Sequence, residues 1–177
     1  MLNKKLSSSI IFCCVLFLAK NVYAADSSIE VKARLLDNTC EVDIGSRNLT
    51  IDLLDIASKQ FFIVGKESLI VPFTIDFSRC SFNTRSVKIK FIGNPDSNNS
   101  ELLATASGTD MADGIGIQIM DNHYSRIPIN TFQGSYIPLD ASSLSNRLQY
   151  YTNMVSTKPS ITPGKVRSSA TFVLEFE

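Results

Sequence analysis

The feature that most constrains this fold is an alternating run in the last residues, 166–177, with the sequence VRSSATFVLEFE. A two-residue period predicts a β-strand with one apolar face. The last core-type residue is the penultimate one, and no polar tail follows it. Because chain ends usually fray, we expect something to hold this apolar strand in place. Its inward face is predicted to consist of Ala170, Phe172, Leu174 and Phe176.

A second alternating run lies near the other end of the chain, in residues 29–35. Its apolar positions alternate with Glu30, Lys32 and Arg34, so it also predicts a strand with one apolar face. One strand therefore looks unfinished and the other looks spare, and the two together suggest a protein that is completed by a neighbour. The apolar positions of this run are Ile29, Val31, Ala33 and Leu35.

Residues 1–24 have the pattern of a secretory signal peptide, with basic Lys4 and Lys5 before an apolar stretch of about ten residues. We expect cleavage after Ala24. A membrane anchor is the less favoured alternative, because Lys20 ends the apolar run too early to span a bilayer. No other segment is long enough to cross a membrane. The mature chain, from Ala25, has about 153 residues, which suits one domain with a real core.

The composition of the mature chain narrows its partners and its redox state. The signal holds three of the 17 basic residues and none of the 17 acidic ones, so the mature net charge is about −3. There is no basic patch, and nucleic acid is therefore not expected as a partner. After signal removal two cysteines remain, Cys40 and Cys80. An even pair in an exported protein predicts one disulfide, worth roughly 4 kcal/mol for a loop of this length.

Nearly every other segment predicts a short strand, and turn clusters separate the strands. We expect an all-β protein with two sheets packed face to face. The cluster Gly45 to Asn48 is predicted as a turn, and residues 53–60 as a turn or a short helical connection. The predicted strands are centred on residues 40–44, 49–53, 73–77, 87–91, 115–119 and 148–154.

The sequence offers little that could carry catalysis. His123 is the single histidine and stands in a polar stretch typical of a loop. Asp110 and Asp113 flank a turn, where aspartate commonly bonds to nearby backbone. One histidine and two distant cysteines do not make an ordinary zinc site. We therefore expect no catalytic residue, no metal site and no cofactor, and we predict that the protein is not an enzyme.

Several motifs resemble those of chaperone–usher pilins, most closely the minor tip-adapter subunits of type 1 fimbriae. The similarity begins with the extension and the segment 37–40 (DNTC), continues through 71–73 (VPF) to Cys80, and includes 98–104 (NNSELLA) and 114–118 (GIGIQ). It is closest at the end, in 162–164 (TPG) and 169–177 (SATFVLEFE). The resemblance spans the mature chain. Two positions differ from the family pattern, since Phe176 replaces the usual tyrosine and Ala33 stands where a glycine is frequent.

The resemblance implies an incomplete immunoglobulin-like β-sandwich that is completed by a donor strand from a neighbouring subunit. It divides the chain into a signal peptide (1–24), a donor-strand extension (25–39) and a pilin domain (40–177). In that division Ile29, Val31, Ala33 and Leu35 form the donor strand. The strand that binds the chaperone and lines the acceptor groove comprises Gly164, Ala170, Phe172, Leu174, Phe176 and Glu177.

The implied function is a structural minor subunit of an adhesive fimbria, acting as an adapter between tip adhesin and rod. The implied partners are other pilus subunits, a periplasmic chaperone and an outer-membrane usher, and the implied location is a fimbrium on the bacterial surface, reached through the periplasm. Two alternatives remain. One is a major rod pilin of the same family, and the other is a self-sufficient secreted β-sandwich that binds a ligand. A spare alternating strand argues against the second, because a complete domain has no need of one.

Overall fold

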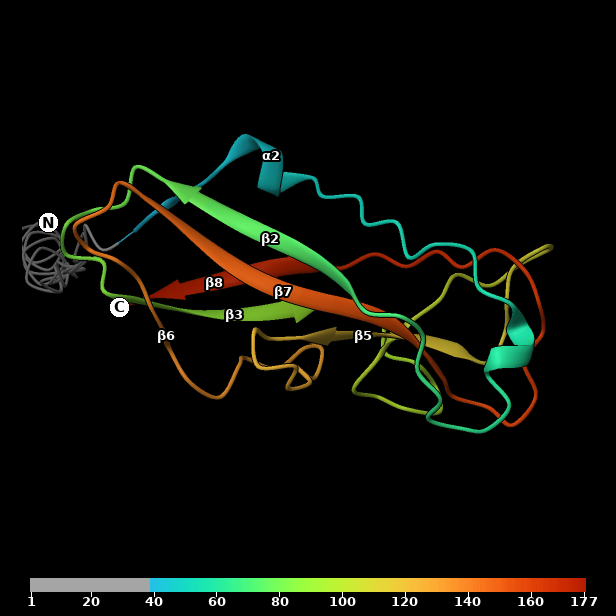
Figure 1. The fold of residues 1–177 in the computed structure, drawn as a ribbon. Coiled ribbons are helices and arrows are strands. Elements are labelled where there is room, and N and C mark those ends of the chain that lie inside the picture. The colour runs from blue at the N-terminus through green and yellow to red at the C-terminus, as the bar shows by residue number, and fades with distance from the viewer. Residues whose placement is uncertain (1–38) are drawn as a thin grey trace, which may run out of the picture. The chain divides into compact units, whose positions relative to one another are not determined.

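The computed structural model describes residues 39–177, and its regular secondary structure is almost entirely β-strand (Figure 1). Within that range no helix is long or apolar enough to span a membrane. The elements are β1 (Glu41–Val42), α2 (Ile44–Arg47), η1 (Ser58–Gln60), β2 (Val71–Ser78), β3 (Ser86–Ile92), β4 (Leu103–Ala104), β5 (Ile115–Met120), β6 (Ile137–Pro138), β7 (Ser145–Ser156) and β8 (Thr171–Phe176).

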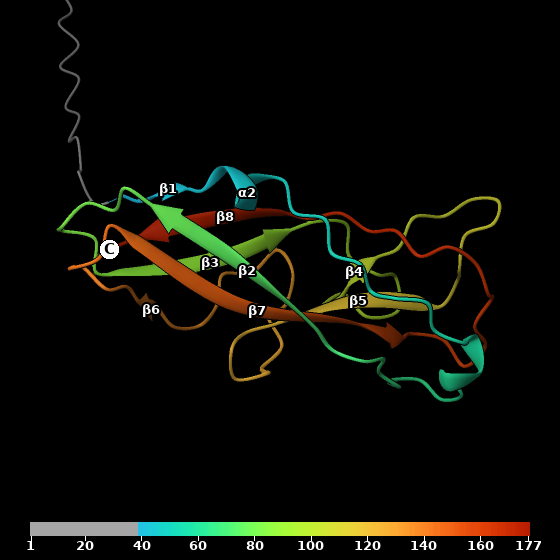
Figure 2. The same ribbon diagram turned by 45° about the horizontal axis from the view of Figure 1, so that its top comes forward.

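The strands form two sheets, as the alternating runs predicted. One sheet has the order β1-β2-β7-β5-β4, and the other has the order β6-β3-β8. All strand pairs are antiparallel. The longest ladder joins β2 to β7 and runs from Val71 opposite Thr152 to Ser78 opposite Ser145. Figures 1 and 2 show β3 and β8 lying against β2 and β7, which places the core between the two sheets.

Alternation determines which side chains enter the core. In β3, Val87, Ile89 and Phe91 are buried, whereas Lys88 and Lys90 lie on the outer face. The outer ammonium groups sit over aromatic rings, with Lys88 Nζ 4.2 Å from the ring centre of Tyr136 and Lys90 Nζ 4.4 Å from that of Phe132. β3 therefore has one apolar and one polar face, the pattern of a half-buried strand, whereas all six residues of β5 are buried.

Aromatic rings occupy the middle of the core. The ring of Tyr150 stacks on Phe73 and meets Phe91 edge-on, each at a centroid distance of 5.6 Å. Phe77 meets Phe176 edge-on at 5.9 Å. Burial, with a smaller contribution from the charge of Asp121, raises the pKa of the Tyr150 hydroxyl. Phe176 thus joins β8 to the aromatic core of the opposite sheet.

The region before β2 differs from the sequence-based expectation. The predicted turn after β1 is a single turn of helix, α2, whose first amide donors are capped when Gly45 N donates to the Asp43 carboxylate at 3.1 Å. Residues 49–53 are extended but belong to no ladder among residues 39–177. The predicted helical connection shortens to the 3₁₀ turn η1. Residues 49–53 have the alternation of a strand, but a segment joins a sheet only when a neighbouring strand pairs with it.

Two sheet edges therefore stay open on the same side of the sandwich. β8 pairs only with β3, and β1 pairs only with the last two residues of β2, Phe77 and Ser78. Pro72, which has no amide hydrogen, lies in the part of β2 that β1 does not reach. Between these edges, the chain from α2 to η1 runs alongside the chain that leads into β8 (Figures 1 and 2).

Candidate functional site: an open groove between two sheet edges

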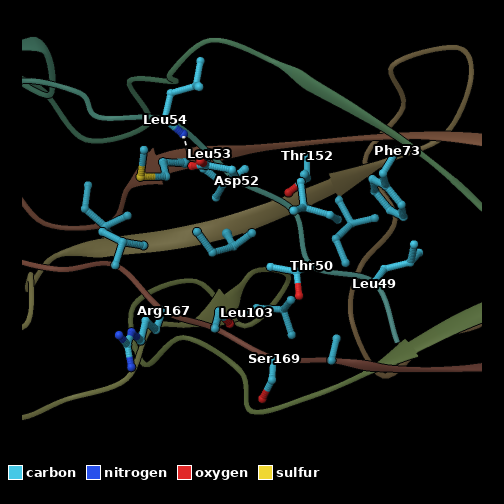
Figure 3. A pocket seen from close by; sticks show the side chains of 18 of the residues that line it. Leu49, Thr50, Asp52, Leu53, Leu54, Phe73, Leu103, Thr152, Arg167 and Ser169 are labelled. Atoms are coloured by element: carbon cyan, nitrogen blue, oxygen red, sulfur yellow. Dashed lines mark hydrogen bonds between the residues drawn. The ribbon is translucent and has the colours of Figure 1, made fainter. Parts of the chain in front are cut away.

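A groove of 1620 Å³ opens between the two unpaired edges (Figure 3). Residues 47–58 form one wall and residues 161–172 form the other. Its floor is the core of the sandwich itself, so side chains from both sheets line it. The main floor residues are Phe61, Phe73, Ile75, Phe91, Leu103, Ile115, Ile117, Ile119, Thr152 and Met154.

The first wall is an extended segment with its own alternation. Ile51 and Leu53 are half-buried, whereas Asp52 is exposed. The alternation shifts at Leu54, which adopts a left-handed conformation (φ 64°) that is uncommon for a residue other than glycine. The Asp52 carboxylate accepts a hydrogen bond from Leu54 N at 2.9 Å and so stabilises this bend (Figure 3). After the bend Ile56 becomes the next half-buried residue.

The second wall is bonded on its outer side only. Ala106 N donates to Arg167 O at 2.7 Å, and the Ser168 hydroxyl donates to Ala104 O at 2.7 Å. Residues 166–170 belong to no ladder of the described sheets. The side that faces the groove therefore presents strand-like backbone without a partner strand, a feature that templates the addition of another strand.

Gly164 sets the position of this wall. A Cβ atom built on Gly164 would lie 2.4 Å from Met111 C and 2.5 Å from Ala112 N, far inside any normal contact. The close approach is maintained by neighbouring backbone bonds, from Lys165 N to Asp110 O at 2.8 Å and from Ala112 N to Lys165 O at 2.9 Å. Only glycine fits here, because the obstacle is backbone rather than a flexible side chain.

An ion pair holds the chain at the entrance to the second wall. Lys158 Nζ lies 2.7 and 2.8 Å from the two carboxylate oxygens of Asp113. The hydrogen bond from Lys158 lowers the pKa of the Asp113 carboxyl. Asp113 N also donates to Thr162 O at 3.1 Å, and Thr162 lines the groove. The start of the second wall is therefore held in place by a backbone hydrogen bond and by an ion pair.

The structure places the six predicted residues of the groove strand in two groups. Gly164, Ala170 and Phe172 line the groove. Leu174 and Phe176 lie further along β8 and pack against the core. Glu177 closes the strand, since its carbonyl oxygen accepts hydrogen bonds from Arg85 N (2.8 Å) and Ser86 N (3.1 Å). Whether a chaperone binds along this whole set stays a prediction.

The predicted disulfide between Cys40 and Cys80 is confirmed. It ties the start of the described chain to the loop after β2, and Ser81 N donates to Thr39 O at 3.0 Å beside it. The predicted donor residues Ile29, Val31, Ala33 and Leu35 lie outside the described residues, as does most of the predicted extension 25–39. Their role stays a prediction.

Sequence reasoning missed the first wall as part of the site. Leu49, Ile51 and Leu53 were assigned to an ordinary strand, although the same alternation could have suggested a groove wall. It also missed Gly93, where an added Cβ would lie 2.4 Å from Leu103 Cδ2 and 3.1 Å from Ser169 O. No sequence signal distinguishes Gly93, because its constraint comes from a wall that is distant in the chain.

The arrangement is suited to binding an extended peptide. An incoming strand would find apolar floor positions at alternate residues and an unpaired backbone edge on β8. The groove contains no histidine, and among residues 39–177 no group of three or more acidic, histidine or cysteine side chains is placed to hold a metal ion.

Comparison with known proteins agrees with this geometry. The family model described as fimbrial protein matches residues 28–177. The chain belongs to the fimbrial protein family. The fimbrial-like protein YdeS of Escherichia coli K12 is 37% identical over 93% of this chain and 94% of its own length. The S-fimbrial protein subunit SfaG of E. coli O6:K15:H31 is 28% identical over 98% of this chain and 99% of its own.

Solved structures agree on the fold of this fimbrial subunit. A subunit of a chaperone–usher pilus aligns with a TM-score of 0.66 and 19% identity, covering 90% of this chain and all of that one. The P pilus rod subunit PapA aligns with a TM-score of 0.66 and 21% identity, covering 78% of this chain and 99% of its own. The fold is therefore the incomplete immunoglobulin-like sandwich of pilins.

Proposed function

We propose that this subunit joins its neighbours by donor-strand exchange and acts as an adapter between tip adhesin and rod. The observation that carries the exchange is the apolar groove of 1620 Å³, bounded by residues 49–57 and 166–170, which belong to no ladder of the described sheets. An open groove of this kind is an aggregation hazard. A periplasmic chaperone would cover it first, an outer-membrane usher would direct the exchange, and the extension of another subunit would then fill it on the cell surface.

The acceptor role can be tested with a self-complemented chain, in which residues 25–38 are joined after Glu177 by a short flexible linker. Ile29, Val31 and Leu35 would enter the groove, and burial is worth about 1.5–3 kcal/mol for each side chain. We expect this chain to be monomeric and to melt well above the mature chain without the graft. Val31→Asp in the graft should abolish the gain, whereas Lys32→Ser, at an outward position, should retain it. Equal melting temperatures for the two variants would contradict the alternation.

The donor role needs the subunit that precedes this one toward the tip. A peptide spanning residues 25–38 should displace the chaperone from that subunit and stabilise it. A one-residue slip would bury Glu30, Lys32 and Arg34 instead, so the register should be unique. Native mass spectrometry of the mixture measures the exchange directly. Persistence of the chaperone complex at saturating peptide would refute the donor assignment.

The adapter position rests on the resemblance to tip-adapter subunits, and the alternative is a major rod pilin. The alternative has support of its own, because the relatives include a probable major fimbrial subunit of E. coli O157:H7, LpfA, at 28% identity. The two positions differ in copy number. Immunogold labelling of isolated fimbriae should mark only the tip region for an adapter, and labelling along the shaft would assign this chain to the rod.

A further inference from the structure

Three consecutive large apolar side chains stand in solvent next to the groove. Phe62, Ile63 and Val64 are 67%, 56% and 55% exposed, and together they are called the end patch here. Single exposed apolar residues are normal, but a contiguous group marks an interaction surface. The groove does not account for the end patch, because its lining includes Phe61 but none of the three patch residues.

The end patch is held rigidly. The hydroxyl of buried Ser156 donates to Ile63 O at 2.5 Å and accepts from Lys66 N at 2.9 Å. Gly65 N donates to Ser156 O at 2.9 Å, and Gly65 has φ +82°, which a tight turn favours at this position. A surface fixed in this way loses little conformational entropy when it is covered.

The end patch lies at the end of the groove opposite to the C-terminus. Ser156 is the last residue of β7, and the chain that follows it becomes the second groove wall at Ile161. Figure 1 shows η1, which Phe61 separates from the patch, at one end of the described body and the C-terminus at the other. A strand that fills the groove therefore has one of its ends beside the end patch.

The following step rests on the proposed donor-strand exchange. All ladders between the named strands are antiparallel, and antiparallel pairing is slightly more stable per residue. A donor antiparallel to β8 leaves the groove at the Gly164 end. In a donor with this chain's spacing, only residues 36–39 separate Leu35 from Cys40, a reach of about 14 Å. The disulfide ties Cys40 to the donor's body, so that body lies within this reach of the groove end beside the end patch.

A parallel donor would conflict with the next subunit. It would bring the incoming body to the Glu177 end. Thr39, from which this chain's own extension departs, is bonded to Ser81 at that same end, near Arg85, which binds Glu177. With an antiparallel donor, each subunit binds one neighbour at the Gly164 end and the other neighbour at the opposite end, which is what a head-to-tail fibre requires.

The disulfide end of this chain carries an apolar surface of its own. Phe82 and Leu144 are 75% and 62% exposed, and Leu144 O accepts a hydrogen bond from Cys80 N at 3.4 Å. We propose that the end patch packs against the disulfide end of the subunit whose extension fills the groove, as a second contact between consecutive subunits. On the other side, Phe82 and Leu144 would meet the corresponding end of the preceding subunit.

Photo-crosslinking in fimbriae assembled on cells tests this proposal. A benzophenone amino acid replaces Phe62 or, in a second variant, Val64, and both positions are exposed enough to accept it. The control position is Tyr124, which is 56% exposed but lies in the loop after β5, stacked on Tyr151. We expect positions 62 and 64 to link to the disulfide end of the donor subunit, as mapped by mass spectrometry, and position 124 to give no such adduct.

The outcomes separate the two levels of the proposal. The contrary results are variants that enter fibres but give no adducts at positions 62 and 64, or give adducts to another part of the neighbouring subunit. Either result would overturn the second contact and leave donor-strand exchange intact. If the unsubstituted subunit does not enter fibres, the proposed function fails, and this inference fails with it.

Discussion

Replacing Gly164 by alanine tests whether the second groove wall is set by backbone contact. The new Cβ would lie 2.4–2.7 Å from the backbone of Met111 and Ala112, where ordinary contact begins near 3.4 Å. The wall must therefore move by about 1 Å, and overpacking of this kind costs about 1–3 kcal/mol. The shift also strains the two hydrogen bonds of Lys165, each worth about 1 kcal/mol. We expect a total loss of about 2–5 kcal/mol.

This loss should lower the melting temperature of the self-complemented chain by about 4–20 °C, given about 2–4 °C per kcal/mol for a domain of this size. Gly134→Ala is the matched control, because no atom lies within 4 Å of its added Cβ and its φ is not in the left-handed range. That variant should melt within a degree or two of the parent. If Gly164→Ala and Gly134→Ala melt alike, the steric argument is wrong and the wall is not fixed by Gly164.

Two further predictions concern β8 and the groove entrance. Phe176→Asp should destabilise the self-complemented chain by at least about 2 kcal/mol, since it places a charge beside Phe77. Val173→Asp, on the outer face of β8, should cost about 1 kcal/mol or less. Similar chemical denaturation midpoints for the two variants would contradict the assigned faces. Lys158→Met should raise the pKa of Asp113 in an NMR titration of its carboxyl carbon. Folding lowers the pKa of Asp113, so the ion pair stabilises the protein at pH values above the pKa that Asp113 has in the unfolded chain. This contribution is lost as the pH falls through the pKa of Asp113 in the folded protein. An unchanged Asp113 titration in the variant would refute the ion pair.

The sequence by itself determined the elements that depend on local periodicity. Alternation in residues 73–77, 87–91, 115–119 and 148–154 corresponds to β2, β3, β5 and β7, because a strand with one buried face must repeat every two residues. The two cysteines outside the predicted signal peptide sufficed to predict the disulfide. The resemblance of the last residues to pilins led to the family, and the fimbrial family model confirmed it.

Tertiary structure alone decided which alternating segments join a sheet and which are left to bind a partner. Residues 49–53 alternate as well as any strand, yet they line the groove and belong to no ladder of the described sheets. Gly164 and Gly93 are constrained by backbone and side chains far away in the chain, which no local pattern encodes. The exposed end patch next to the groove likewise depends on where β7 ends. Side-chain period is a property of neighbouring residues, but a missing strand is a property of the assembled sheets.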